Sequence, residues 1–272
     1  MAAPCDARAE VLSNTHLSPD YNVLVLAAPA IARAAMPGQF VMIRTTDGSD
    51  PLLRRPFSVF EILRDADGRP SALSVLCKRV GVGTTRLFQA AAGDTVDCLG
   101  PLGRPFTLVT PPAEAWMVAG GVGLAPFAAL TERLRGADVG TTLFYGGRSQ
   151  SDLFYLDWFA ARGVRLELAT EDGSRGTHGR ITAPLDAALQ HRHSPAPVMI
   201  YACGPEPMLK AVADLARRHG RRCEVSTERV MGCGMGGCYS CVVAILESDG
   251  RRHFVRSCLC GPVFDASQVV WE

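Results

Sequence analysis

Cysteines near the C-terminal end are the residues of this sequence best suited to chemistry. The 272-residue chain contains ten cysteines, and four of them gather at Cys233, Cys238, Cys241 and Cys258. Four residues separate the first pair, two separate the next, and the last follows after sixteen more. This spacing is typical of plant-type [2Fe–2S] proteins, in which one loop supplies three of the thiolate ligands. Glycines between the cysteines let the loop turn sharply and direct its N–H groups at the sulfurs. The pattern predicts an iron–sulfur cluster held by these four thiolates.

Two other uses of these cysteines compete with the cluster. A structural zinc site usually has two C-x2-C pairs, and this sequence has one. A disulfide framework suits secreted chains, and the N-terminus shows no basic region followed by an apolar run. Cys260 is close enough to Cys258 to act as a substitute ligand or simply to pack. The other cysteines are expected to be small buried residues: Cys5, Cys77, Cys98, Cys203 and Cys223.

Two small-residue turns in the middle of the chain could bind phosphate. The first, with Gly120, Gly121 and Gly123, follows a buried-strand pattern and opens a helical one. The second is Cys203-Gly204-Pro205, again between a strand and a helix. Small residues let a phosphate approach the free N–H groups of a helix N-terminus. Either turn alone could be a tight connection that binds nothing, but two of them at the carboxyl ends of parallel strands would line one crevice.

The elements that must position these residues fall into two regions and a tail. The first hundred residues contain short strand patterns at 23–26, 40–44, 57–60 and 73–76, separated by turns, which is typical of an antiparallel barrel or sandwich. From Trp116 onward, strand patterns at 116–119, 142–145, 166–169 and 198–202 alternate with helical ones, up to a helix over 206–219. That alternation indicates βαβ units and a parallel sheet.

The sequence therefore predicts a multidomain β plus α/β protein. We expect an N-terminal antiparallel β-barrel over 1–110, a Rossmann-like parallel-sheet nucleotide domain over 111–222 and a C-terminal cluster domain over 223–272, with Pro111-Pro112 as a hinge. The net charge of +1 argues against a general nucleic-acid or membrane-surface binder. No run of 18 apolar residues appears, which argues against a membrane span.

Taken together, these motifs resemble the ferredoxin-reductase superfamily. Arg55-Pro56-Phe57-Ser58 matches its flavin motif, and the two small-residue turns match its nicotinamide domain. Within that superfamily the sequence is most similar to the electron-transfer subunits of class 1B dihydroorotate dehydrogenase. Three segments carry this narrower likeness: 170–174, 226–238 and 261–264.

The resemblance implies a set of FAD-binding residues. Arg55 would pair with an FAD phosphate as a bidentate donor, and Ser58 would lie close to the flavin with Pro56 and Phe57. Leu76, Cys77 and Lys78 would lie along the flavin, and Gly83 and Thr84 would bind its pyrophosphate. Relatives often have tyrosine in place of Cys77 and arginine in place of Lys78, which puts aromatic stacking at this strand in doubt.

The resemblance also implies a circuit. A partner subunit containing FMN would oxidise dihydroorotate to orotate, and electrons would pass through the [2Fe–2S] cluster and FAD to NAD⁺, in cytoplasmic pyrimidine (UMP) biosynthesis. Such subunits form heterotetramers with two copies of each chain. No side chain of this chain need act as a general acid or base. We expect the segment 232–241 to form much of the interface with the partner.

Other functions stay open on the sequence alone. One is the FAD and [2Fe–2S] subunit of another NAD(P)H-linked reductase, of the ferredoxin, sulfide or hydrogenase type. Another is a non-catalytic sensor that binds flavin and cluster. A zinc-stabilised binding module is a third. Arg148 and Ser149 suit either a 2′-phosphate or a solvated turn, so the sequence does not decide between NAD and NADP.

Overall fold

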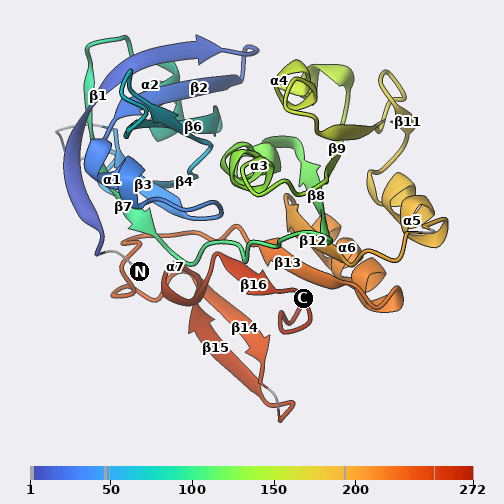
Figure 1. The fold of residues 1–272 in the computed structure, drawn as a ribbon. Coiled ribbons are helices and arrows are strands. Elements are labelled where there is room, and N and C mark those ends of the chain that lie inside the picture. The colour runs from blue at the N-terminus through green and yellow to red at the C-terminus, as the bar shows by residue number, and fades with distance from the viewer. Residues whose placement is uncertain (1–2, 46–47, 49, 193, 248, 272) are drawn as a thin grey trace.

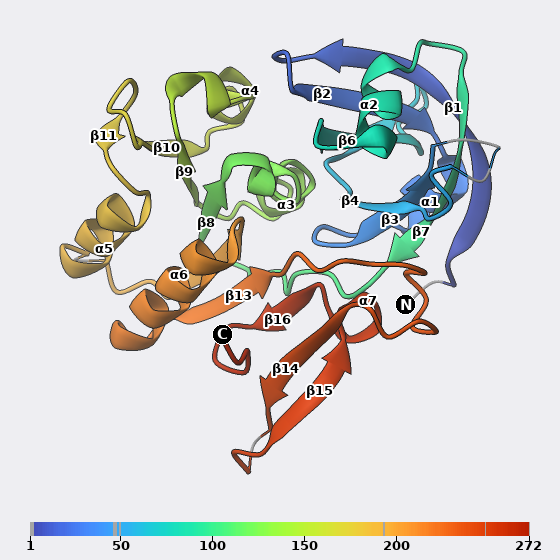
Figure 2. The same cartoon turned by 180° about the vertical axis from the view of Figure 1, so that it is seen from behind.

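The computed structural model describes residues 3–45, 48, 50–192, 194–247 and 249–271. It shows an antiparallel sheet at the N-terminal end, a largely parallel sheet beside it and a hairpin beneath both (Figures 1 and 2). The expected fold class is thereby confirmed. Among the described residues, no helix is long and apolar enough to cross a membrane.

The N-terminal sheet has seven strands in the order β4-β3-β7-β1-β2-β6-β5. They are β1 (Cys5–His16), β2 (Tyr21–Ala27), β3 (Phe40–Arg44), β4 (Arg55–Ser58), β5 (Glu61–Arg64), β6 (Pro70–Lys78) and β7 (Thr95–Leu102). Helices α1 (Pro29–Ala34) and α2 (Val82–Gln89) lie between strands. The sheet curls so that β4 approaches β6, which makes an open barrel (Figure 1).

Strand alternation explains how this sheet is buried on both sides. On β6, Leu73, Val75 and Cys77 point into the core of the barrel. Leu76 on the same strand points the other way, into a second core shared with the nucleotide half. Successive side chains of a strand face opposite sides, so one apolar run serves two cores.

The second sheet has the strand order β11-β10-β9-β8-β12-β13-β16. Its strands are β8 (Glu114–Gly120), β9 (Thr141–Gly147), β10 (Arg165–Thr170), β11 (Thr177–His178), β12 (Val198–Cys203), β13 (Arg222–Ser226) and β16 (Val263–Asp265). The pairings from β11 to β13 are parallel, and β16 is antiparallel to β13. The order reverses between β8 and β12, where ligands bind in open α/β sheets.

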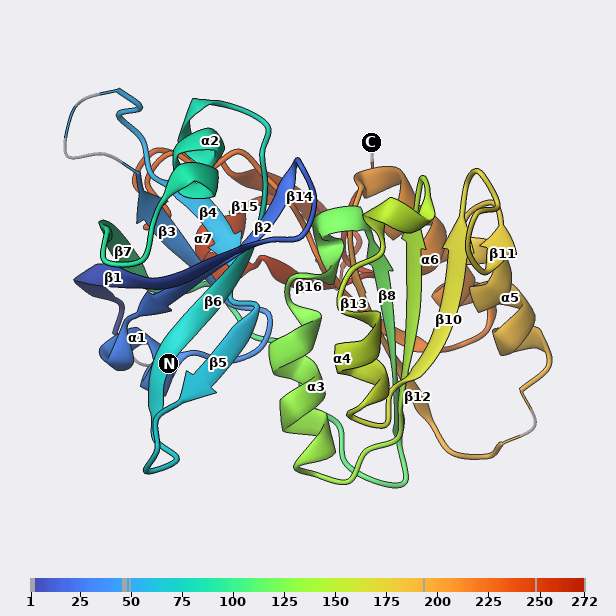
Figure 3. The ribbon, with the colours of Figure 1, turned by 90° about the horizontal axis from the view of Figure 1, so that it is seen from above.

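Helices cover both faces of this sheet. They are α3 (Phe127–Arg135), α4 (Leu156–Ala160), α5 (Thr182–Gln190) and α6 (Glu206–Arg218), with the single turns η1 (Gly121–Leu124) and η2 (Gln150–Asp152). Helices α3 and α4 share the core that reaches the barrel, whereas α5 and α6 belong to the core on the other face (Figure 3). The expected helix over 206–219 is thus found as α6.

The barrel and the nucleotide half are packed together. Phe60 and Leu76 of the barrel lie in one buried cluster with Phe127 of α3. The amide of Ala129 in the first turn of α3 donates to the carbonyl of Phe60 at 2.8 Å. First-turn amides have no partner within their own helix, so this bond satisfies one of them with the barrel.

The C-terminal segment packs against both the barrel and the nucleotide half. It contains β14 (Val242–Leu246) and β15 (Arg252–Arg256), which form a hairpin, and the short helix α7 (Ser257–Cys260). β16 then pairs with β13 at the end of the nucleotide sheet. The hairpin projects from the rest of the molecule in Figures 1 and 2.

Candidate functional site

The four clustered cysteines meet where the C-terminal segment packs on the barrel. Cys241 immediately precedes β14 and Cys258 lies in α7, and the amide of Ser257 donates to the carbonyl of Cys241 at 2.8 Å. Both cysteines are buried in one apolar group with Met42 of β3 and Leu102 of β7. The backbone bond and this shared core bring together two of the predicted ligands, which are far apart in the sequence.

The other two cysteines lie on the exposed side of the loop. The amide of Met235 donates to the sulfur of Cys233 at 3.4 Å, and the hydroxyl of Ser240 lies 3.0 Å from the sulfur of Cys238. Hydrogen bonds, first from Ser240 and then from Cys233, lower the pKa of Cys238 to about 6. A lowered pKa favours the thiolate, which is the form that binds metal.

Burial has the opposite effect at Cys258, where it raises the pKa to about 12, with the neighbouring thiol of Cys241 as the next cause. The four thiols therefore form two neighbouring pairs, Cys233 with Cys238 and Cys241 with Cys258. No three His, Cys, Asp or Glu side chains of the described residues converge on the position of a single metal ion. Two such pairs suit a [2Fe–2S] cluster, which takes two protein ligands at each iron.

Cys260 faces away from this site. It packs against the core of α5 and α6, whereas Cys258 belongs to the group that contains Cys241. Two positions along an α-helix differ by about 200°, so the two sulfurs point to opposite sides of α7. All ten cysteines are free thiols in the structure.

The two small-residue turns touch one another at the switch point of the sheet. A Cβ on Gly123 would lie 2.2 Å from the carbonyl oxygen of Cys203, and one on Gly204 would lie 3.1 Å from the amide nitrogen of Gly120. Such approaches leave room only for glycine. Pro205 completes the second turn, where its Cδ would lie 3.0 Å from a Cβ on Gly120. The structure thus brings both predicted turns to one place.

On the barrel, Arg55 reaches the N-terminus of α2. A Cβ on Gly83 would lie 3.5 Å from Cγ of Arg55, and the guanidinium donates to the carbonyl of Leu53 at 2.8 Å. Thr84 accepts hydrogen bonds from the amides of Val80 and Gly81 at 2.8 and 3.0 Å. A guanidinium beside a helix N-terminus suits the pyrophosphate of a dinucleotide, since both favour anions.

The side chains of residues 76–78, at the end of β6, lie in three different environments. Cys77 is fully buried in the barrel core, and burial raises the pKa of its thiol to about 12, so only its backbone faces outward. Leu76 lies in the core shared with the nucleotide half. The ammonium of Lys78 lies 5.4 Å from the ring centroid of Tyr21.

Tyr21 is a candidate residue that sequence reasoning missed. It pairs in register with Lys78, its ring lies 4.8 Å from that of Phe154, and its hydroxyl would be 3.9 Å from a Cβ on Gly121. It therefore joins the expected flavin strand to the first nucleotide turn. Only the pairing of β2 with β6 reveals this, because Tyr21 lies far from both in the sequence.

Several large hydrophobic side chains are exposed in and around the cluster loop, residues 232–241. These side chains have 41–83% of their surface exposed and lie just before the loop, within it or in the elements that follow it: Val230, Met235, Tyr239, Phe254 and Leu259. Scattered exposed apolar residues are normal, whereas a group of them often marks an interaction surface.

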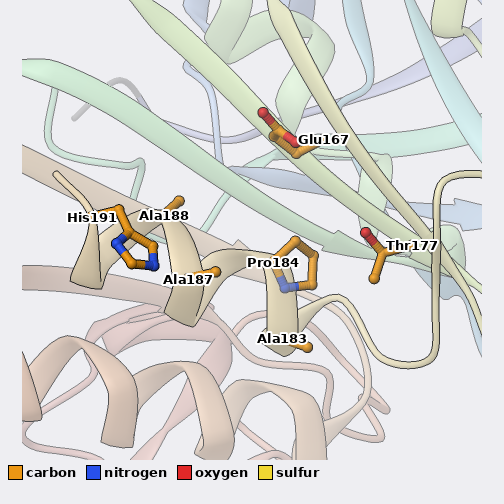
Figure 4. Close-up of a pocket in the computed structure, with 7 residues that line it drawn as sticks. All are labelled: Glu167, Thr177, Ala183, Pro184, Ala187, Ala188 and His191. Carbon is orange, nitrogen blue, oxygen red and sulfur yellow. The ribbon is translucent and has the colours of Figure 1, made fainter.

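A surface pocket elsewhere is unconnected with these residues. It has a volume of about 480 Å³ and lies between α5 and the strands β10 and β11 (Figure 4). Glu167, Thr177 and His191 provide its polar groups, and small residues of α5 provide much of the remainder. None of the predicted site residues lines it.

Comparisons with known proteins agree with this geometry. The family model for the iron–sulfur cluster binding domain of dihydroorotate dehydrogenase B matches residues 228–270, and that for the oxidoreductase NAD-binding domain matches residues 117–214. The chain is 37% identical to the dihydroorotate dehydrogenase B (NAD(+)) electron transfer subunit of Desulforamulus reducens, over 97% of this chain and 98% of that one. It is 38% identical to the subunit of the same name from Geobacillus kaustophilus, over 91% of each chain.

Solved structures show the same architecture. A chain of an NADH-dependent reduced ferredoxin-NADP oxidoreductase, studied for flavin-based electron bifurcation, aligns with a TM-score of 0.82 and 29% identity over 97% of this chain and 90% of that one. A ferredoxin NADP⁺ reductase from Neisseria gonorrhoeae, solved with FAD and NADP, aligns with a TM-score of 0.62 and 21% identity over 79% of this chain and 92% of that one. The second likeness concerns the fold.

Proposed function

Because this chain belongs to the electron transfer subunits of dihydroorotate dehydrogenase B, we propose that it carries electrons from a dihydroorotate-oxidising partner to NAD⁺. It is an oxidoreductase subunit of pyrimidine biosynthesis that uses FAD, a [2Fe–2S] cluster and NAD. When bound, the cluster passes single electrons, FAD converts between single electrons and a hydride, and NAD⁺ accepts the hydride.

The observation that carries this proposal is a row of contacts linking the three sites. A Cβ on Gly234 in the cluster loop would lie 2.6 Å from Cγ of Met42, and Met42 pairs in register with Pro56 of the flavin motif. On the other side of the barrel, Tyr21 approaches Gly121 of the nucleotide turns. These contacts support the proposal, because stepwise electron transfer requires neighbouring sites.

Individual residues receive their roles as part of this proposal. Cys233, Cys238, Cys241 and Cys258 hold the cluster. Arg55, Gly83 and Thr84 bind the FAD pyrophosphate, while the backbone of residues 56–58 and 76–78 borders the flavin ring. Both glycine turns receive the dinucleotide. The regions 1–110, 111–222 and 223–272 serve FAD, NAD and the cluster respectively, with β13 and β16 shared along the nucleotide sheet.

The partner in this proposal is the FMN-containing catalytic subunit, in a heterotetramer with two copies of each chain. The exposed apolar side chains in and around the cluster loop form its docking surface, because apolar side chains gain from being covered and two of them, Met235 and Tyr239, lie between the cluster cysteines in the sequence. We place the complex in the cytoplasm, where thiolate ligands stay reduced.

Anaerobic purification tests the cofactors first. We expect about one FAD and two irons per chain, with absorption bands of both. Mixing the chain with a dihydroorotate dehydrogenase catalytic subunit should then give dihydroorotate-dependent reduction of NAD⁺. Zinc in place of iron and flavin would refute the proposal at its first step.

A second candidate is the role of the bifurcating oxidoreductase chain, favoured by its TM-score of 0.82 over nearly the whole molecule. That role predicts exchange between NADH, NADPH and ferredoxin without any response to dihydroorotate. Comparing dihydroorotate with reduced ferredoxin as the electron source, with matched partner subunits, separates the two.

A further inference from the structure

Ser240 occupies a special position between two of the cluster cysteines. Its hydroxyl oxygen accepts a hydrogen bond from the amide of Gly232 at 3.0 Å and lies 3.0 Å from the sulfur of Cys238. The loop closes tightly around this group, because a Cβ on Gly232 would lie only 3.2 Å from the same sulfur. The hydroxyl is therefore held in place by the backbone on one side and directed at a ligand on the other.

The direction of the second hydrogen bond follows from the chemistry of the ligand. A cysteine that binds iron is a thiolate and has no proton to give. The amide of Gly232 already uses a lone pair of the Ser240 oxygen. In the loaded protein the hydroxyl must therefore donate its proton to the sulfur of Cys238.

A hydrogen bond to a ligating sulfur has a predictable electrical effect. The donor withdraws charge from the thiolate, and the reduced cluster, which carries one more negative charge, gains more from this than the oxidised cluster does. We propose that Ser240 is a positioning residue that raises the reduction potential of the cluster through its hydrogen bond to Cys238. This inference rests on the proposed function, since it requires a [2Fe–2S] cluster on the four cysteines.

The surroundings of the other ligands make this bond distinctive. The sulfur of Cys233 accepts a hydrogen bond from the backbone amide of Met235, and no side-chain substitution removes that donor. Cys241 and Cys258 are buried among apolar side chains such as Met42. The Ser240 bond lies on the exposed side of the loop, where water competes with it in the isolated chain. A partner that covers this side would exclude the water and strengthen the bond.

The test is a redox titration of the isolated, reconstituted chain, followed by electron paramagnetic resonance of the reduced cluster. Ser240→Ala should shift the midpoint potential to more negative values. Ser240→Thr keeps the hydroxyl and should restore it, whereas its near-isostere Ser240→Val should behave like the alanine variant. Tyr239→Phe is the matched control, because it removes a neighbouring hydroxyl from a side chain that is 63% exposed.

The possible results distinguish an effect of Ser240 on the reduction potential from an effect on cluster assembly. A negative shift in the alanine and valine variants, with the threonine variant and Tyr239→Phe close to wild type, supports the proposal. An unchanged potential in the alanine variant overturns it. So does a failure of the alanine and valine variants to load iron while threonine loads, since the hydroxyl would then act in assembly. Absence of any cluster from the wild-type chain is a different result and refutes the proposed function itself.

Discussion

At the scale of single residues, Cys258 and Cys260 can be compared to test which cysteine of α7 binds the cluster. They lie on opposite sides of α7, and only Cys258 shares a core with Cys241. We expect Cys258→Ser to abolish or strongly reduce iron and sulfide content, whereas Cys260→Ser should retain two irons per chain. Iron analysis and absorption spectra of both variants provide the measurement. Equal loss of iron in the two would show that Cys260 is needed for the cluster as much as Cys258.

Arg55 and Arg54 form a second matched pair. Arg55 lies against the N-terminus of α2, whereas Arg54 makes a surface ion pair with Asp6 at 2.8 Å. A hydrogen bond to a charged group contributes about 1.5–3 kcal/mol, which corresponds to roughly 10- to 150-fold in affinity. Arg55→Ala should weaken FAD binding by about this factor, while Arg54→Ala should leave it unchanged. Fluorescence titration of apoprotein with FAD measures both constants.

Gly123 tests the nucleotide turns. Any side chain there would collide with the backbone of Cys203, so Gly123→Ala must push the two turns apart. We expect NADH–dye reductase activity to fall at least tenfold with FAD and iron content retained. Gly140→Ala is the control in the same half of the chain, because its added Cβ meets nothing closer than 3.8 Å. Full activity of the Gly123 variant would argue that the dinucleotide binds elsewhere.

At the scale of elements, some strands could be predicted from the sequence and others could not. β8 and β12 are apolar runs that end in small residues, so both the strands and the turns after them were visible. β1 was not predicted, because its alternation rests on small side chains such as Ala7 and Ala9 among charges. The contact of Tyr21 with Lys78 depends on strand register, which local pattern does not contain.

The hairpin and the cluster loop are linked by one side chain. The guanidinium of Arg256 on β15 donates to the carbonyl of Gly236 at 2.7 Å and stacks 4.6 Å from the ring centroid of Tyr239. We expect Arg256→Met to loosen the loop and to increase the rate of cluster loss in air severalfold. Arg251→Met, at an exposed position in the hairpin turn, is the control. Bleaching of the iron–sulfur absorption over time measures the rate.

At the scale of the whole molecule, Glu61 lies at the junction of the barrel and the nucleotide half. Burial raises its pKa, only partly offset by a hydrogen bond from Ser74 and by Arg162 of the nucleotide half. A carboxyl with a raised pKa in the folded state favours folding below its unfolded value of 4.5, and this contribution is lost as pH rises through the folded pKa. The ionised carboxylate is therefore unfavourable at neutral pH.

Glu61→Gln should consequently raise the melting temperature at pH 7, and its advantage should shrink as the pH falls toward 4.5. Glu247→Gln, at an exposed position of the C-terminal segment, should show no such pH-dependent difference. Thermal unfolding of the three proteins across this range measures the effect. A variant less stable than wild type at pH 7 would indicate that the hydrogen bond from Ser74 and the attraction to the charge of Arg162 outweigh burial.

The return of β16 to the edge of the nucleotide sheet sets a limit on modularity. The cluster-bearing segment begins directly after β13, and its strand β16 pairs back with β13. The segment therefore covers the edge of the strand from which it starts. Cutting the chain after Ser226 would leave β13 as an unprotected sheet edge, which invites pairing with other chains. Exchanging cluster segments between reductases therefore means exchanging an edge strand as well, and a transplant has to match the register of Val225 with Phe264 as well as the cysteine spacing.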